Sequence, residues 1–371
     1  MTKYRFDQIA LNSTEKKKPV EEDRFTYLGL EHLDSGSLKV SRYGSEVAPI
    51  GEKLVMRKGD VLFGKRRAYQ KKVAIAPFDG IFSAHGMVLR PKEDVVDKDF
   101  FPLFISSDYF LDAAIKISVG SLSPTINWRD LKELEFELPD LESQKRLAST
   151  LWAMNETMDS YKELIAATDE LVKSQFIEMF KNHSDTKKVL KELFDLQMGK
   201  TPARAETKLW QSKDHKWISI ADMSTYGKYT GETKEYISDI AVKESGIKIV
   251  PKNTVIMSFK LTIGRTAITS EDIYTNEAIM AFVPKQDLFN LDYLRHALSY
   301  FNWSGDLQNA VKGVTLNKAI IGNALFSVPP LEIQNQFSSF VEQSDKSKFE
   351  LEQALSELNA TYKRIIAENL G

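Results

Sequence analysis

An internal repeat spanning nearly the whole chain is the feature that most limits how this sequence can fold. A shift of 190 positions places Pro139–Gln144 on Pro329–Gln334. In the middle of each half the shift drifts to 193–194, where Leu89–Lys92 matches Phe282–Lys285. The identity is thin, but the landmarks keep their order. A period this long indicates duplicated domains rather than a solenoid.

Both halves change character at the repeated proline. Before it, short β-type runs are broken by Gly, Pro, Asn and Asp, and each half carries one helical pattern, Phe101–Ile117 and Leu291–Leu307. After it, each half is glycine-free and helical for roughly 40 residues. We therefore predict a first domain at residues 1–140, a spacer helix at 141–186, a second domain at 187–328 and a C-terminal spacer helix at 329–371.

Apolar residues on the two spacer helices follow a 4-3-4-3 spacing, which is a heptad seam. The predicted seam residues are Leu147, Leu151, Met154, Met158, Tyr161, Ile165, Leu351, Leu355, Leu358 and Tyr362. Ser344 and Lys348 interrupt the second seam, so we expect weaker packing or a partner contact there. The expected fold is α+β, with two pseudo-repeated α/β domains of short twisted sheets separated by two long antiparallel helices in a coiled coil. Two independent amphipathic helices are the alternative.

Composition excludes several kinds of chemistry. The chain has no cysteine, which rules out disulfides, thiol catalysis and Cys-based zinc sites. No stretch approaches 18 apolar residues, and the N-terminus lacks the apolar run of a signal peptide, so we expect a cytoplasmic protein with no membrane span. The five histidines are scattered without metal-ligand spacing, so each is expected to be a surface or packing histidine.

Nucleotide and catalytic motifs are missing as well. Gly199-Lys200-Thr201 superficially suggests a P-loop, but Phe194 stands where the pattern needs glycine. No GxSxG elbow or GxGxxG loop is present. Nothing in the sequence supports catalysis by this chain.

Charge is distributed unevenly along the chain. The 50 Lys+Arg and 52 Asp+Glu give a net charge of −2, which by itself argues against nucleic acid. The spacer helices, however, hold 9 basic and 15 acidic residues (5 and 8, then 4 and 7), while residues 187–328 hold 19 and 15. Arg57–Lys72 alone carries seven positive charges against one. Phosphate binding depends on the local positive charge rather than on the net charge of the chain, so this basic run favours DNA binding more than the net charge does. The simpler alternative is that the run is an ordinary solvated surface.

Together these residues resemble the specificity subunits of type I restriction-modification systems. The resemblance covers essentially the whole chain and is strongest at the two proline–Leu–Glu–x–Gln helix starts, the Gly199…Trp217 opening of the second domain and Thr262–Arg265. Two departures are Lys200, where a second glycine is common, and Glu277, where glutamine is common. The first domain carries Lys65-Arg66-Arg67-x-Tyr69 in place of the Thr-Ile-Gly version of the central loop.

The resemblance implies two target-recognition domains, each reading one half of a bipartite, asymmetric site in double-stranded DNA. The helices then set the spacing and hold two modification (methyltransferase) subunits, and restriction (motor-nuclease) subunits complete the complex. This chain would be non-catalytic and carry no cofactor. S-adenosylmethionine, ATP and magnesium would belong to the partner subunits of this restriction endonuclease and adenine methyltransferase.

Candidate DNA contacts lie in basic loops and in the turns before the final strand of each domain. Cations are expected to engage phosphate, or guanine where an arginine reaches a base edge, and ordinary turn capping is the alternative for the turn residues. The candidates are Lys65, Arg66, Arg67, Tyr69, Gln70, Lys71, Lys72, Ser123, Thr125, Asn127, Lys200, Thr201, Arg204, Lys260, Thr262, Arg265, Thr315, Asn317 and Lys318.

Two other functions compete with this one. A non-catalytic coiled-coil scaffold or adaptor would use the helices for protein partners only. A specificity subunit of a related bipartite system with methyltransferase but no motor would read DNA in the same way.

Overall fold

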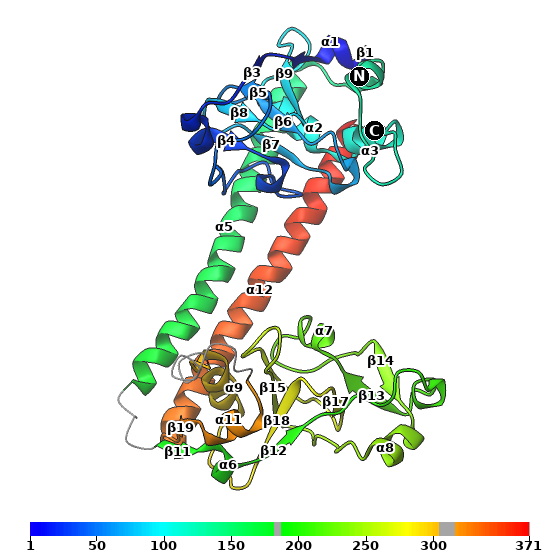
Figure 1. Ribbon diagram of the computed structural model, residues 1–371. Helices are drawn as coiled ribbons and strands as arrows, with labels where there is room; N and C mark the ends of the chain where they lie inside the picture. The colour runs from blue at the N-terminus through cyan, green and yellow to red at the C-terminus, as the bar shows by residue number, and fades with distance from the viewer. Residues whose placement is uncertain (182–186, 304–315, 371) are drawn as a thin grey trace. The chain divides into compact units, whose positions relative to one another are not determined.

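The computed structural model describes residues 1–181, 187–303 and 316–370 and divides into two compact units. The first unit comprises Met1–Lys162 and Gln353–Gly371, and the second comprises Glu163–Glu352. Each unit contains one copy of the repeat and a segment of each of two long helices, α5 (Leu141–Phe180) and α12 (Leu331–Leu370) (Figure 1). The expected duplication and the two long helices are confirmed.

Two small sheets form the body of the first unit. The main sheet is antiparallel, in the order β2 (Ala10–Ser13), β9 (Met87–Pro91), β6 (Val61–Phe63) and β7 (Val73–Ile75). The other sheet has the order β3 (Lys16–Lys17), β5 (Lys53–Met56), β8 (Gly80–Phe82) and β4 (Tyr27–Leu28), with β8 and β4 parallel. Side chains alternate along β6, so Val61 and Phe63 enter one core and Leu62 enters another. The main sheet is therefore apolar on both faces.

The second unit repeats this arrangement. Its antiparallel main sheet has the order β12 (Phe194–Met198), β18 (Ile279–Pro284), β15 (Val255–Ser258) and β16 (Thr266–Ile268). Its other sheet has the order β14 (Glu235–Ile237), β13 (His215–Ile218) and β17 (Tyr274–Thr275), with β13 and β17 parallel. Pro91 pairs with Ala10 in the first unit, and Pro284 pairs with Phe194 in the second. Pro91 and Pro284, which the sequence repeat aligned, therefore occupy equivalent positions in the two main sheets.

A separate two-stranded sheet and several short helices complete each unit. In the first unit these are β1 (Thr2–Arg5) paired with β10 (Glu135–Leu138), α1 (Phe6–Ile9), η1 (Glu21–Thr26), η2 (Leu30–His32), η3 (Ala68–Gln70), α2 (Phe100–Ser106), α3 (Asp108–Lys116) and α4 (Trp128–Leu131). In the second they are β11 (Lys187–Val189) paired with β19 (Leu325–Ser327), α6 (Leu190–Leu193), η5 (Thr207–Leu209), α7 (Ile220–Met223), α8 (Asp239–Ser245), α9 (Leu291–Tyr300) and α11 (Lys318–Asn323).

The helical pattern expected at Phe101–Ile117 is two helices rather than one. The chain leaves helical geometry at Ser107, whose ψ is 150°. The Ser107 hydroxyl accepts a hydrogen bond from the Phe110 amide at 3.3 Å and so begins α3 as an N-cap. The apolar periodicity continues across the break, which is why the sequence pattern did not reveal it. In the second domain the helix is shorter than expected, because α9 ends at Tyr300 and Phe301 is extended, with a ψ of 135°. Leu307, the expected end, lies outside the described residues.

The long helices are 40 residues each and pack antiparallel within each unit. In the first unit, Ile366 and Leu370 near the end of α12 share a core with Ala148 and Leu151 near the start of α5. In the second unit, Phe337 near the start of α12 packs on Phe180 at the end of α5, with ring centroids 5.6 Å apart. Within the described residues, no helix has both the length and the apolar character needed to cross a membrane.

The predicted seam residues are buried or half-buried, including Leu151 and Met158 at 1% and 7% exposure. A contact with the facing helix also compensates for the polar interruption of the seam. Ser344 is buried, and the Lys348 ammonium lies 2.7 Å from a carboxylate oxygen of Asp169 on α5. A lysine at a seam position is stabilised here by a partner on the facing helix, which adds a polar point of register to an apolar seam.

A buried glutamine joins the start of each long helix to its domain. The Gln144 side chain accepts a hydrogen bond from the Asp97 amide at 2.8 Å and donates to the carbonyls of Val95 and Pro139. Gln334 makes the same three bonds in the second unit, with the Asn290 amide and with the carbonyls of Leu288 and Pro329. Both side chains are fully buried. The repeated sequence motif is therefore a structural joint.

A buried polar cluster lies between α9 and α12 in the second unit. The Lys228 ammonium is 2.8 Å from the Asp292 carboxylate, which also accepts a hydrogen bond from Ser338. His296 lies one turn beyond Asp292. Its Nδ1 is 2.8 Å from the Asp292 carbonyl, and its Nε2 is 3.1 Å from Arg295 Nη2. A neutral imidazole fits both contacts, because Nδ1–H donates to the carbonyl and Nε2 accepts from arginine.

His296 is expected to make the second unit sensitive to acid. Burial, followed by the neighbouring Arg295, lowers the pKa of His296 from 6.5 to about 4. Because the folded pKa lies below the unfolded one, the stability that neutral His296 supports is complete above pH 6.5 and is lost as the pH falls toward 4. Between pH 7 and pH 5 this amounts to about 2 kcal/mol.

The measurement is urea unfolding of wild type and His296→Asn at both pH values. Asparagine can still donate to the Asp292 carbonyl but does not titrate, so the variant should lose less stability on acidification than wild type. Burial raises the pKa of the nearby Asp345 carboxyl, so this group stabilises the folded state as the pH falls. That effect is opposite to the effect of His296 and is present in both proteins. Equal losses in the two proteins would remove His296 as the cause.

Candidate nucleic-acid interface

The basic run of the first domain forms a loop between β6 and β7, which we call the first loop (Gly64–Lys72). Its main chain is fixed at several points. The Arg67 amide donates to the Pro124 carbonyl at 2.8 Å, and the Ile126 amide donates to the Lys65 carbonyl at 2.9 Å. Arg67 has a positive φ of 54°. These bonds bring the first loop against the turn that carries the predicted residues Ser123, Thr125 and Asn127.

The cations of the first loop fall into two groups. Arg66 and Arg67 are exposed, and within the described residues neither guanidinium pairs with a carboxylate. Arg66 instead lies 3.4 Å from His85, whose pKa is lowered by burial and by Arg66 itself, so a neutral imidazole can accept from it. Lys65 is half-buried, and burial together with Lys16 lowers its pKa. Arg66 and Arg67 are thus the cations that the loop presents to solvent.

Lys71 and Lys72 are engaged within the chain. The Lys71 ammonium bonds the carboxylates of Asp108 and Asp112 at 2.6 and 2.7 Å. The Lys72 ammonium donates to the Leu30 carbonyl at 2.6 Å. Both side chains therefore hold the loop on its domain, and contact with phosphate would require these bonds to open.

Other candidates of the first domain surround Arg66 and Arg67. Tyr69 lies on η3 and is 57% exposed, whereas the Gln70 carbonyl accepts a hydrogen bond from Ser35. The Thr125 hydroxyl donates to the Ser123 carbonyl at 3.0 Å. Asn127 begins α4 without a side-chain cap bond. Tyr69 is the exposed aromatic side chain of the first loop.

The second domain places an equivalent loop between β15 and β16, which we call the second loop (Phe259–Arg265). The pairing of β15 with β16 matches that of β6 with β7. The predicted residues Lys260, Thr262 and Arg265 are exposed on it. Arg265 donates to the Ser224 carbonyl at 2.6 Å, and Lys260 lies 5.8 Å from the centre of the Phe259 ring. Topology thus gives each domain one exposed basic loop at the same place.

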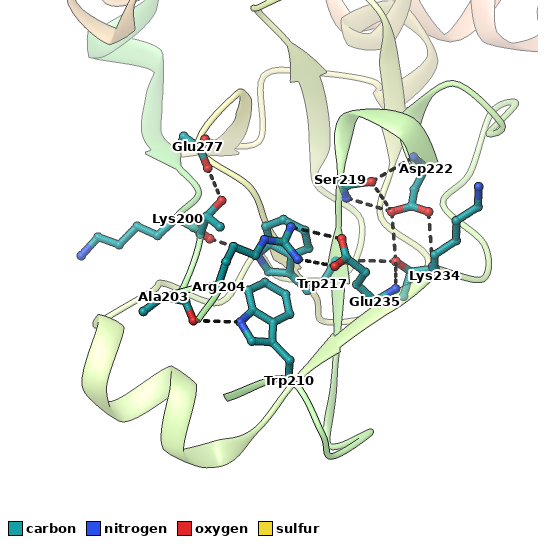
Figure 2. A network of polar contacts seen from close by, with 12 residues as sticks. Lys200, Ala203, Arg204, Trp210, Trp217, Ser219, Asp222, Lys234, Glu235 and Glu277 are labelled. Atoms are coloured by element: carbon teal, nitrogen blue, oxygen red, sulfur yellow. Dashed lines mark hydrogen bonds and ion pairs between the residues drawn. The ribbon is translucent and has the colours of Figure 1, made fainter. Parts of the chain in front are cut away.

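The segment after β12 lies beside the β17–β18 turn (Figure 2). The Lys200 ammonium donates to the carbonyls of Ser245 and Gly246 at 2.9 and 3.3 Å, at the C-terminal end of α8. Thr201 donates to Glu277, and this bond lowers the pKa of that carboxyl. A Cβ at Gly199 would lie 2.0 Å from a main-chain oxygen, so only glycine fits there. Lys200 and Thr201 are therefore held by the domain itself.

Arg204 is enclosed by aromatic rings and a carboxylate that the sequence did not predict. Its guanidinium lies 4.0 Å from the Trp210 ring centre and 4.8 Å from that of Trp217, and it pairs with Glu235 (Figure 2). The Trp217 indole N–H donates to the Lys200 carbonyl at 2.9 Å. This stack fixes Arg204 in one direction while leaving its side chain half-exposed, an arrangement suited to a flat base or a phosphate.

Asp222 organises the neighbouring turn. Its carboxylate accepts from the Ser219 amide and hydroxyl, from the Thr233 hydroxyl and from the Lys234 amide. Burial alone would raise the pKa of Asp222, but these bonds, led by Ser219, hold it below its usual value. Asp222 therefore has a structural role in fixing this turn.

The turn before the last strand of the second domain is partly described. The Asn317 side chain caps α11 by accepting from the amides of Ala319 and Ile320 at 3.0 and 3.1 Å, which is the capping role considered as the alternative. Lys318 follows it and is exposed. Thr315 lies outside the described residues. Among the residues that the structure does describe, no group of His, Cys, Asp and Glu could hold a metal ion.

A family model matches both halves of the chain, at residues 13–167 and 185–359, and its description is type I restriction modification DNA specificity domain. The chain belongs to this family. The two matched segments correspond to the two copies of the repeat, each with most of the long helix that follows it.

Curated relatives that match shorter stretches of the chain are also specificity subunits of type I restriction enzymes. The chain is 28% identical over 183 residues to the type I restriction enzyme EcoDI specificity subunit of Escherichia coli, covering 48% of this chain and 40% of the relative. It is 28% identical over 132 residues to the MjaIX specificity subunit of Methanocaldococcus jannaschii, covering 35% and 30%. The matched stretches thus span less than half of each relative's length.

Solved structures of similar fold match over the whole chain. One belongs to work on complex assembly and conformational transition of the type I R-M system, with a TM-score of 0.62, 19% identity and coverage of 99% and 97% of the two chains. Another is the S subunit of a type I restriction-modification system from M. genitalium, with a TM-score of 0.54, 15% identity and coverage of 100% and 96%. At these identities the likeness establishes the fold.

Proposed function

We propose that this chain is the DNA-specificity subunit of a type I restriction-modification complex. Each duplicated domain reads one half of a bipartite, asymmetric site in double-stranded DNA. The observation that carries this proposal is the pair of equivalent exposed basic loops, one in each copy of a fold that belongs to the specificity-domain family. The two loops differ in sequence, with Lys65-Arg66-Arg67 in one and Thr262–Arg265 in the other, so two different half-sites are expected.

Helix α5 sets the distance between the two half-sites. It continues without a break from residues of the first unit into residues of the second, and at about 1.5 Å per residue its 40 residues extend about 60 Å. A helix of fixed length between the two domains would impose an unread gap of fixed length between the half-sites, as dimer geometry does in other DNA-binding proteins. Inserting a turn into α5 would lengthen that gap.

The reactions belong to partner subunits. S-adenosylmethionine is bound by the modification subunits, and ATP and magnesium by the motor-nuclease subunits, while this chain supplies recognition. Four buried aspartates of the described residues are all engaged in internal hydrogen bonds or ion pairs, which favours this division; they are Asp23, Asp60, Asp222 and Asp292. The complex acts on DNA in the cytoplasm.

Exposed apolar residues on the long helices are the proposed docking surface for a methyltransferase subunit. Leu164, Leu171 and Ile177 on α5 are 51%, 53% and 55% exposed, and Phe349 on α12 is 64% exposed. Leu164 and Leu171 are one heptad apart, so they lie on one face beside the seam rather than in it. Apolar side chains at this spacing outside the seam favour a protein partner.

Replacing Leu164 and Leu171 by aspartate is expected to weaken methyltransferase association at least tenfold, because two leucines lose their burial and two charges enter the interface. Size-exclusion chromatography of the co-expressed complex measures this association. Ala166→Asp with Lys173→Asp is the control, since it adds two aspartates at the same spacing on a different face of α5. An equal loss in both double variants would place the docking surface elsewhere.

Methylome sequencing tests the proposed function directly. Cells with this gene and its methyltransferase partner are expected to methylate a bipartite asymmetric site, and deletion of this gene should abolish that methylation. Unchanged methylation after deletion would contradict the proposal and favour a scaffold. A helicase-nuclease gene beside the methyltransferase gene would distinguish a restriction system from a methyltransferase-only one.

A further inference from the structure

The tip of the second loop has an exposed leucine in a strained conformation. Leu261 is 90% exposed and has a φ of 62°. The Thr262 amide donates to the Lys260 carbonyl at 2.8 Å, which closes a three-residue turn with Leu261 at its centre. Positive φ in such a turn is unfavourable for a residue with a Cβ, and glycine would adopt it without strain.

The domain holds this turn in place. Ser258 is fully buried, and its hydroxyl donates to the Thr262 carbonyl. The Gly264 amide donates to the Ser258 carbonyl at 3.0 Å, and the Ser258 amide donates to the Arg265 carbonyl at 2.9 Å. Because the base of the loop is tied to the end of β15, the tip cannot relax without breaking these bonds. Strain that the surroundings maintain is typical of functional positions.

A single exposed leucine would be ordinary on any protein surface. Leu261 differs because it combines exposure with strain and has cations on either side. Lys260 precedes it and Arg265 ends the loop, while Ile263 beside it is 47% exposed. Burial does not explain why an apolar side chain stands at this position, because Leu261 remains exposed in the folded domain.

The first loop repeats these features at the equivalent place. Arg67 and Lys71 have φ values of 54° and 50°, and between them Tyr69 is 57% exposed. Two loops of unrelated sequence therefore both hold positive-φ residues and an exposed apolar or aromatic side chain next to exposed basic residues. This recurrence points to a shared use of the loop tip.

We propose that Leu261 is a wedge that inserts between two stacked base pairs of the DNA half-site read by the second domain, while Lys260 and Arg265 hold the flanking phosphates. Apolar wedges of this kind unstack a base step and kink the duplex. A base next to an unstacked step is easier to rotate out of the helix, so the wedge would also assist a partner enzyme that must extract its target base. The inference rests on the proposed DNA-reading function.

The experiment uses the full chain with its methyltransferase partner and an unmethylated duplex that contains the site identified by methylome sequencing. In a series of such duplexes, 2-aminopurine replaces one adenine at a time in or beside the half-site read by the second domain. Wild type is expected to raise 2-aminopurine fluorescence at one step. Leu261→Gly removes the side chain and relieves the positive φ. It should therefore abolish the rise and weaken binding about tenfold or more, with the salt dependence of binding unchanged.

Two further variants make the result specific. Leu261→Met keeps a long apolar side chain and should retain the fluorescence change. Leu325→Ala shortens another exposed leucine of the second unit, on β19, and should leave binding unchanged. The melting temperature of Leu261→Gly should equal or exceed that of wild type, because the strain is gone, so lost binding cannot be attributed to unfolding.

The outcomes separate the wedge from the proposed function. If wild type and Leu261→Gly bind the duplex equally, or the fluorescence rise persists in the variant, Leu261 is not a wedge even though the chain reads DNA. If wild type shows no preference for the site, the proposed function falls, and the wedge falls with it.

Discussion

Replacing Arg66 and Arg67 together by alanine is expected to weaken DNA binding about 60-fold near 0.1 M salt and to reduce the slope of log K against log salt by about 1.8. Both effects have one cause, since each lost phosphate contact also loses the release of its counterion. These two arginines are chosen because both are exposed and, in the described part of the chain, neither pairs with a carboxylate. Fluorescence anisotropy at several salt concentrations measures both quantities.

A control must remove the same charge elsewhere in the first unit. Lys3 and Lys132 suit this purpose because each already pairs with a glutamate, Glu135 at 2.7 Å and Glu133 at 3.5 Å. Their double alanine variant should leave the salt slope near that of wild type. If the Arg66 and Arg67 variant keeps the wild-type slope, these residues do not contact phosphate, whatever happens to affinity.

The duplicated architecture could be predicted from the sequence because both of its signals are local and repeated. The proline that begins each long helix and the 4-3-4-3 spacing after it are readable from neighbouring residues alone. The sequence also identified Ser344 and Lys348 as interruptions of the seam. It could not show that Lys348 meets Asp169, since the two residues are 179 positions apart and only the helix pairing brings them together.

The candidate interface was harder to predict because its geometry depends on distant contacts. The sequence gathers Lys71 with Arg66 in one basic run, yet Lys71 is held by Asp108 and Asp112 from α3. Arg204 similarly depends on Glu235, which lies 31 positions away. The positive φ of Leu261 could not be predicted from the amino-acid composition of its loop. Charge counts therefore locate a basic surface, but they do not distinguish cations that are exposed to solvent from cations that are bonded to groups of the same domain.

Replacing Gln334 by leucine is expected to destabilise the second unit by about 3 kcal/mol or more. Leucine is close to glutamine in size, so no large cavity forms, but three main-chain groups lose their partners. These are the Asn290 amide at 2.8 Å and the carbonyls of Leu288 and Pro329 at 3.0 and 2.7 Å. Each unpaired, largely buried group costs about 1–3 kcal/mol. Urea unfolding followed by circular dichroism measures the loss.

Gln353→Leu is the matched control on the same helix, because Gln353 is exposed and bonds only Glu357 among the described residues. It should change stability by about 0.5 kcal/mol or less. Gln144→Leu should destabilise the first unit as Gln334→Leu does the second, since the same three bonds are lost. If the glutamines only filled space, leucine would be tolerated at both positions. A loss at both positions, and none at Gln353, would establish that the repeated motif fastens each duplicated domain to the long helix that follows it.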